Sequence, residues 1–185
     1  CIAWDFSHGA VLAATGLLLA PVLGEALIAG AFPDGIAAPG GTHQDLDHLW
    51  SSSAVRFATE SGGGGRNEKA AVVGPDAFGT RWLSVCWEVP GEHNCGRCCK
   101  CVVTMTNFHI AGHLDAVRDR FDADLTPAGV LAVVHEGTPT TPMNGRLILD
   151  RLAPDDPLRP AWERMLEVAL ARDAATQRKA AAAAP

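Results

Sequence analysis

Four cysteines carry the clearest chemical signal in this sequence. Cys95 follows Cys86 by nine positions, and Cys98 and Cys101 then follow at intervals of three. Two residues between successive ligands, with Gly96 easing the turn, let a chain wrap around one small cation, and the first cysteine would complete the set from across the loop. Zinc prefers such a closed set of four sulfurs, which leaves no coordination position for a substrate. The spacing therefore predicts a structural zinc site.

Other uses of these cysteines stay open. The last three also resemble the ligand run of ferredoxin-like iron–sulfur proteins, and disulfides or unbound thiols are a third reading of the pattern. His93 and His109 flank the cluster and could replace one sulfur, although four cysteines already suffice. We expect Cys99 to point away from the ion. Arg97 and Lys100 would offset the negative charge of a tetrathiolate centre.

Helices and apolar strands alternate upstream of the cysteines, which indicates an α/β fold with a parallel sheet. We expect helices at residues 8–20 and 66–73, a glycine-rich loop at 61–65, and strands at 25–31, 55–59 and 82–87. The last of these strands would deliver Cys86 at its end. Pro21 ends the first helix.

Helices alone are expected after the cysteines. They lie at residues 102–114, 127–135, 145–152 and 160–171, and a frayed tail follows at 179–185. The sequence therefore predicts two parts, an α/β domain over residues 1–115 that includes the zinc site (86–101) and a helical extension over 116–185.

The composition is that of a globular protein. Of 185 residues, 48% are apolar and 19% are charged, which is enough for a core. The formal charge of −6 argues against a protein that grips nucleic acid through its phosphates. Five of the six cysteines fall within sixteen residues, which favours metal binding in a reducing, cytoplasmic setting over disulfides in a secreted chain.

An apolar stretch at residues 9–32 raises the question of a membrane span. It carries one formal charge, Glu25, but Pro21 and Gly24 split it into pieces shorter than a bilayer crossing. We therefore expect buried core elements here and no membrane contact.

Around the cysteines the chain resembles a known family. Residues 84–112, SVCWEVPGEHNCGRCCKCVVTMTNFHIAG, contain a cysteine, eight residues and then Cys-Gly-x-Cys-x-x-Cys running into a helix. This pattern resembles the zinc-binding end of PP-loop ATP pyrophosphatases, of the adenine nucleotide α-hydrolase superfamily, that are related to 7-cyano-7-deazaguanine synthase. Residues 41–52, GTHQDLDHLWSS, are similar to a further branch of PP-loop proteins. The resemblance covers about residues 1–115.

The resemblance implies a Rossmann-like PP-loop domain, of which this chain would hold the C-terminal part. Such enzymes use ATP and Mg²⁺ to adenylate a carboxylate or carbonyl oxygen, release pyrophosphate, and let a nitrogen nucleophile displace AMP. The family's nucleotide-binding signature, Ser-Gly-Gly-x-Asp-Ser, is absent from the sequence. Because the chain begins with Cys1 and not with Met, we expect that signature upstream of it.

The resemblance also suggests roles for polar residues outside the cysteine cluster. It places His43, Asp45 and Asp47 near the substrate pocket, in a loop region of the kind where such folds bind substrates. Helix capping and surface solvation are the alternative for the two aspartates. Arg66 and Lys69 would balance the charge of pyrophosphate, with a solvated helix face as the alternative.

Three tryptophans could shield the core or the cluster. Trp50, Trp82 and Trp87 are expected to be buried there, with stacking on a nucleobase as the alternative.

The sequence thus favours the C-terminal portion of an ATP-dependent ligase or synthase that acts on a small molecule, possesses a structural zinc site and forms a homodimer. A zinc-stabilised binding module without catalytic activity is the alternative, and an iron–sulfur redox protein is the third hypothesis.

Overall fold

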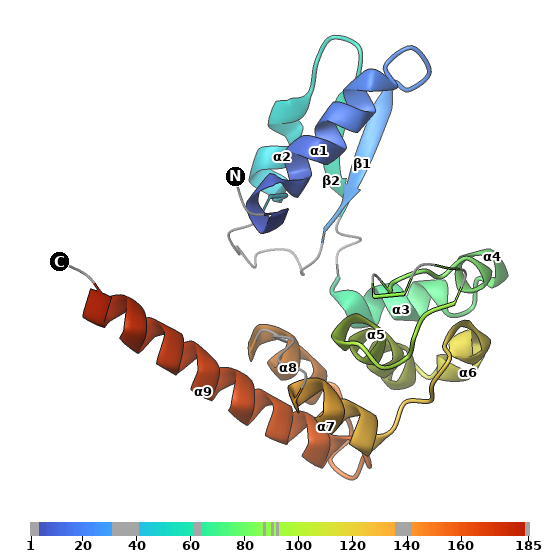
Figure 1. Ribbon diagram of the computed structural model, residues 1–185. Coiled ribbons are helices and arrows are strands. Elements are labelled where there is room, and N and C mark those ends of the chain that lie inside the picture. The colour runs from blue at the N-terminus through green and yellow to red at the C-terminus, as the bar shows by residue number, and fades with distance from the viewer. Residues whose placement is uncertain are drawn as a thin grey trace. The chain divides into compact units, whose positions relative to one another are not determined.

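The computed structural model of the protein (Figure 1) describes residues 4–30, 41–60, 64–86, 88–89, 91, 93–135 and 142–183. Contacts divide the chain into two compact units, Cys1–Lys69 and Ala70–Pro185, and each is described by itself. Cys1, Trp87 and positions 61–63 of the predicted glycine-rich loop lie outside the described residues.

The first unit contains a helix packed on a two-stranded parallel sheet. Its elements are α1 (Trp4–Leu18), β1 (Glu25–Ala29), α2 (Gln44–Asp47), the 3-10 helix η1 (His48–Trp50) and β2 (Arg56–Glu60). The two strands pair in parallel, with Glu25 opposite Arg56 and Ala29 opposite Glu60. The expected α/β class with a parallel sheet is therefore confirmed in this unit, with two strands.

A small apolar core holds α1 against this sheet. Ala13 of α1 is buried with Ile28 of β1 and Phe57 of β2. Gly16 lies so close to the sheet that a Cβ atom there would be 2.6 Å from the Phe57 ring. Side chains alternate along a strand, so Leu27 points to the opposite face of the sheet and is 58% exposed.

Asp47 joins α2 to β2 through two hydrogen bonds. Its side chain is fully buried, Oδ1 accepts the backbone N–H of His43 at 3.1 Å, and Oδ2 accepts the hydroxyl of Thr59 at 2.6 Å. His43 is the N-cap of α2, and its Nδ1 accepts the N–H of Asp45 at 3.2 Å. Of the alternative given for both aspartates, helix capping and surface solvation, surface solvation is therefore wrong for Asp47, whereas Asp45 is exposed.

The second unit is built from helices around one apolar core. Its elements are the end of α3 (Arg66–Val73), then α4 (Ala77–Arg81), α5 (Cys99–Ile110), α6 (Leu114–Val117), the 3-10 helix η2 (Arg118–Arg120), α7 (Pro127–His135), α8 (Pro142–Leu149) and α9 (Arg159–Ala183). Met105 and Phe108 of α5 share the core with Val130 of α7 and Trp162 of α9. The start of α9 packs against α7 and α8 (Figure 1). Residues after position 115 thus pack in the same core as the helix that carries Cys101.

A polar link joins the end of α5 to the turn before α9. His109 Nε2 lies 2.7 Å from Asp156 Oδ2, and Asp156 Oδ1 accepts the N–H of Leu158 at 2.8 Å. Burial opposes ionisation of Asp156, but His109, the Leu158 N–H and Arg159 outweigh it and hold the pKa of this carboxyl below its usual range. The link therefore stabilises the fold at neutral pH, and its stabilisation is lost as the pH falls through the lowered pKa.

Two predicted helices, 66–73 and 127–135, are confirmed to the residue, whereas other elements differ from the prediction. No strand forms over the described residues 82–86, because the N–H groups of Val85 and Cys86 bond to the Asn94 side chain and not to a neighbouring strand. The helix expected from residue 102 begins three residues earlier, at Cys99. The tail expected to fray from residue 179 is helical to Ala183, since alanine favours helix strongly.

The expected burial of the tryptophans is also corrected. Trp82 is 60% exposed and Trp50 is 39% exposed, so neither is a core residue. Trp162, to which the sequence assigns no role, is fully buried in the core of the second unit.

The apolar stretch at 9–32 contributes to α1 and β1, as expected for core elements. Among the described residues, no helix combines the length and the apolar character that a bilayer crossing requires.

Replacing Asp47 by alanine should destabilise the first unit by about 3 kcal/mol, because it removes two hydrogen bonds to a buried carboxylate. Asp45→Ala is the matched control on the same helix, and it should change the unfolding free energy by less than about 0.5 kcal/mol, since that side chain is exposed. Urea denaturation followed by circular dichroism measures both. Equal stabilities of the two variants would contradict the structural role of Asp47.

Candidate metal centre

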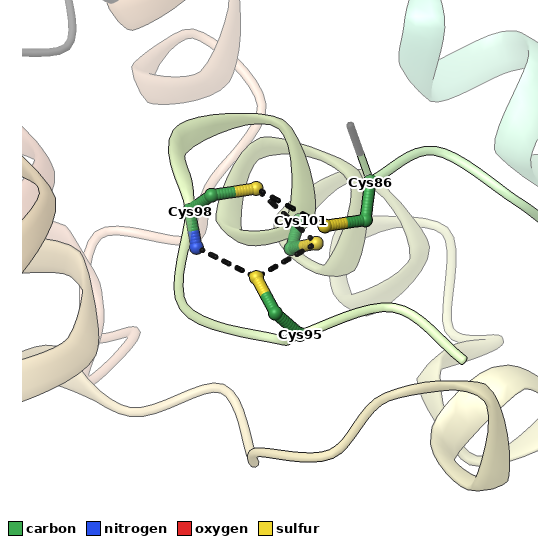
Figure 2. Close-up of side chains that lie close together, drawn as sticks. All are labelled: Cys86, Cys95, Cys98 and Cys101. Atoms are coloured by element: carbon green, nitrogen blue, oxygen red, sulfur yellow. Dashed lines mark hydrogen bonds between the residues drawn. The ribbon is translucent and has the colours of Figure 1, made fainter. Parts of the chain in front are cut away.

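Four sulfur atoms converge at the start of α5 (Figure 2). Cys86 arrives from the segment after α4, Cys95 and Cys98 lie on a tight turn, and Cys101 lies in the first turn of α5. All four Sγ atoms lie within 4.8 Å of one another. The Sγ–Sγ distance is 3.9 Å between Cys86 and Cys98, 3.8 Å between Cys95 and Cys101, and 3.4 Å between Cys98 and Cys101. The four cysteines are therefore positioned to bind a metal ion.

These separations fit one ion. Four sulfurs placed about 2.3 Å from a tetrahedral zinc ion lie about 3.8 Å from one another. In a cluster of two or four irons the four cysteines are divided among the iron atoms, so their sulfurs would not all lie this close together. Cys86, Cys95, Cys98 and Cys101 form no disulfide, and none of these sulfur pairs lies near the S–S bond length of about 2.05 Å. The geometry thus favours a mononuclear site over an iron–sulfur cluster or a disulfide.

The turn between Cys95 and Cys98 requires glycine at position 96. Gly96 has a φ of +70°, in the left-handed region that residues with a side chain adopt only with strain. Its backbone also lies against the segment after η2, where a Cβ atom would be 2.5 Å from the carbonyl oxygen of Ala123. In this conformation the N–H groups of Arg97 and Cys98 point to the Cys95 sulfur, at 3.4 and 3.3 Å.

Asn94 positions Cys86 relative to this turn. Its side chain is 1% exposed, and Oδ1 accepts the N–H groups of Val85 at 2.7 Å and Cys86 at 3.0 Å. Nδ2 donates to the carbonyl oxygens of Leu83 at 3.1 Å and Arg120 at 3.0 Å. All the hydrogen-bonding capacity of the amide is thus used to hold three segments together. Sequence reasoning missed this residue, and its only sequence signal is its place before Cys95.

Burial shapes the acidity of these thiols. It raises the pKa of Cys98 to about 11 and raises that of Cys101 still further. Burial also opposes ionisation of Cys86, but backbone hydrogen bonds, the strongest from Cys95, outweigh it and lower the pKa of that thiol to about 6. A metal ion binds thiolates, so it must displace protons from the site when it binds. The N-terminus of α5 favours the resulting negative charge.

Histidine does not belong to the sulfur group. His93 is more than half exposed, and its Nδ1 lies 3.9 Å from Asp122, while His109 contacts Asp156. Within the part of the chain that the structure describes, the potential metal ligands found together are the four cysteines alone. A ligand set that includes histidine is therefore wrong there, and Cys99 lies outside the group as expected.

The residues predicted to contact substrate and nucleotide lie on other elements. The three predicted substrate contacts gather at α2, joined by the hydrogen bonds within that helix and to β2. Arg66 begins α3, and Lys69 of the same helix donates from Nζ to the carbonyl oxygen of Gly30, directly after β1. Lys69 thus lies at the carboxyl end of a parallel strand, where α/β folds commonly bind ligands. The binding roles of these residues stay predictions.

No protein-family model, curated protein or solved structure matches the chain. The class of the protein is therefore defined by its own fold and site. It is a mixed α/β protein with a four-cysteine cluster, largely buried, that is positioned to bind a metal ion.

Gly96→Ala should destabilise the protein more than Gly112→Ala. Both glycines have positive φ, +70° and +75°, so each substitution carries the left-handed penalty of about 1–2 kcal/mol. Only Gly96 has backbone atoms where the new methyl group would lie, whereas Gly112 has nothing within 4 Å. Gly96→Ala should also weaken metal binding about tenfold or more, in the range of outer-shell substitutions. Equal losses in both variants, measured by thermal unfolding and chelator competition, would contradict this account of the turn.

Metal affinity should rise with pH. At pH 7, binding of one ion should release at least two protons, because the thiols of Cys98 and Cys101 are protonated in the metal-free protein. Two linked protons weaken binding by about 100-fold for each unit by which the pH falls. Calorimetry in buffers of different ionisation enthalpy counts the protons. A pH-independent affinity would show that the free thiols are not protonated as described.

Proposed function

We propose that Cys86, Cys95, Cys98 and Cys101 bind one structural zinc ion. The observation that supports this most strongly is the closed set of four sulfurs within 4.8 Å of one another. Zinc is the typical ion of tetrahedral all-sulfur sites, and four protein ligands leave no position for a substrate. The role of the ion is therefore to hold the fold together.

A bound zinc ion would stabilise the segment that leads to the site. Among the described residues between α4 and α5 there is no helix and no strand, apart from one isolated bridge between Asn94 and Phe121. Hydrogen bonds of Asn94 tie this segment to Arg120, Leu83 and Val85 pack against the apolar core, and the sulfur group brings Cys86 to α5. A bound ion would fix it to a helix whose inner face, with Val102 and Met105, is buried in the core.

The purified protein should be colourless and contain about one zinc ion per chain. Cys86→Ser should weaken zinc binding by more than about 100-fold, since it removes a ligand and not merely an outer-shell contact. Cys99→Ser is the matched control, because Cys99 neighbours the ligands but lies outside the group. Elemental analysis and chelator competition provide the readout. A brown protein that contains iron, or equal losses in both variants, would contradict the proposal.

We propose further that the chain is the C-terminal portion of an ATP-dependent PP-loop enzyme of the 7-cyano-7-deazaguanine synthase type. The cysteine spacing and its entry into α5 support this, as does the order α1, β1, α2, β2 with a parallel strand pair ahead of the cysteines. ATP with Mg²⁺ would activate a carboxylate or carbonyl oxygen of a small molecule for attack by nitrogen. Because the four thiols must stay reduced, the cytoplasm is the proposed location.

Polar residues of the first unit would serve this reaction in different ways. His43 accepts the Asp45 N–H at Nδ1, so its neutral imidazole carries the proton on Nε2 and can donate to a substrate oxygen. Asp47 uses both oxygens within the fold and would position His43 through its backbone. Arg66 and Lys69 would contact phosphate, Lys69 from the carboxyl end of β1.

Pyrophosphate release tests the enzymatic proposal. The protein produced from the start codon of its gene should release pyrophosphate from ATP and Mg²⁺ in the presence of one or more members of a carboxylic-acid panel. Lys69→Ala should lower the rate about 100-fold, as loss of a charge-stabilising group does. Arg164→Ala, at an exposed ion pair on α9, should leave it unchanged. No pyrophosphate and no ATP binding by the zinc-loaded protein would contradict the enzyme and favour a zinc-stabilised binding module.

A further inference from the structure

An exposed cluster of two aromatic rings and one guanidinium lies on and directly after α4. Phe78 is 73% exposed and Trp82 is 60% exposed. The two ring centroids are 6.4 Å apart with a tilt of 56°, and the guanidinium carbon of Arg81 lies 5.4 Å from the centroid of the Trp82 ring. We call these three residues the α4 patch. Large aromatic side chains exposed together on a domain that buries Trp162 completely indicate a surface used for contact.

The backbone that carries the patch is fixed. Asp76 caps α4, accepting the N–H groups of Phe78 at 3.2 Å and Gly79 at 2.9 Å. Thr80 is 8% exposed, and its hydroxyl donates to the Asp76 carbonyl oxygen at 3.0 Å. The Trp82 N–H donates to the Phe78 carbonyl oxygen at 3.2 Å. The patch is therefore presented in a preformed arrangement, so little backbone order remains to be gained when it binds.

The charge of the patch indicates what it would bind. No carboxylate in the described ranges forms an ion pair with Arg81, and both oxygens of Asp76, the acidic residue just before α4, are engaged in the helix cap. The positive charge of Arg81 thus lies over the exposed Trp82 ring, which neighbours Phe78, on a chain whose formal charge is −6. The complementary surface has a carboxylate next to a large apolar side chain.

Two other occupants fit this charge less well. A two-fold contact of the patch with its own equivalent would bring two copies of Arg81 into one interface, and the patch offers no carboxylate to pair with either. A nucleic acid would offer bases for stacking, but the net negative charge of the chain opposes its phosphates. Tryptophan and arginine are, by contrast, the residues most enriched among those that dominate binding between proteins.

We propose that the α4 patch is a docking site for an acidic segment of another protein, in which a carboxylate pairs with Arg81 and a neighbouring apolar side chain packs on Trp82 and Phe78. This role is independent of the ATP chemistry proposed above and of any substrate. It holds equally for an enzyme with a partner and for a binding module.

Selection from a random library of 12-residue peptides displayed on phage tests the docking site. Peptides enriched on the zinc-loaded chain should contain Asp or Glu next to Trp, Phe or Leu. A synthetic peptide of the enriched sequence should bind at least tenfold more weakly to Arg81→Glu and to Trp82→Ser. Arg164→Glu, an exposed arginine on α9, is the matched control and should bind as the unsubstituted chain does. The proposal would be overturned if the enriched peptides were basic or no richer in Asp and Glu than the starting library, or if no peptides were enriched. Peptide binding that is insensitive to the two patch variants would overturn it as well.

Three further measurements test whether something other than a protein partner covers the α4 patch. Binding of a labelled 15-nucleotide single strand that Trp82→Ser abolishes would assign the patch to nucleic acid. Self-association in sedimentation equilibrium that the same variant abolishes would assign it to a second copy. A clear fall in the thermal midpoint of the free chain on Trp82→Ser would show that the chain covers these rings itself. Each of these results would overturn the proposed protein partner, and their absence is expected.

Discussion

The segment that leads into α5 depends on four sulfur atoms that lie close together in a largely buried place, positioned to bind a metal ion. At separations of 3.4–3.9 Å, thiolates would repel one another, and burial further disfavours their charge. A divalent ion removes both costs, because it bonds directly to each sulfur. The surrounding chain also helps to hold the four sulfurs together. A left-handed glycine turn and a fully bonded buried asparagine position the cysteines, and the N-terminus of α5 favours their negative charge.

Short-range features of this protein follow from its sequence. The spacing of the ligands is local, and the helices at 66–73 and 127–135 are predicted to the residue because both have clear limits, as with proline at the start of the second. Hydrogen-bond partners that are distant in the sequence cannot be predicted in this way. The apolar run at 82–86 resembles a strand, but its N–H groups bond to the side chain of Asn94, and Asp47 is buried because Thr59, twelve residues away, donates to it.

The proposed structural and chemical roles fall on different parts of the chain. The four cysteines proposed as metal ligands lie in the second unit, in a closed set that would offer no position to a substrate. The polar residues proposed to contact substrate and phosphate lie in the first unit, where His43 accepts the Asp45 N–H at Nδ1 and Lys69 lies at the carboxyl end of β1. The exposed rings of the α4 patch belong to neither group. In such a chain the metal ion would stabilise the fold, and the other surfaces would serve recognition.

X-ray absorption at the zinc edge of the purified protein tests the central claim most directly. A single zinc ion held by the four cysteines predicts a first shell of four sulfur atoms at about 2.3 Å, with no nitrogen or oxygen and no second metal nearby. A first shell that contains nitrogen or oxygen, a metal–metal distance, or a protein purified without any metal would contradict the account.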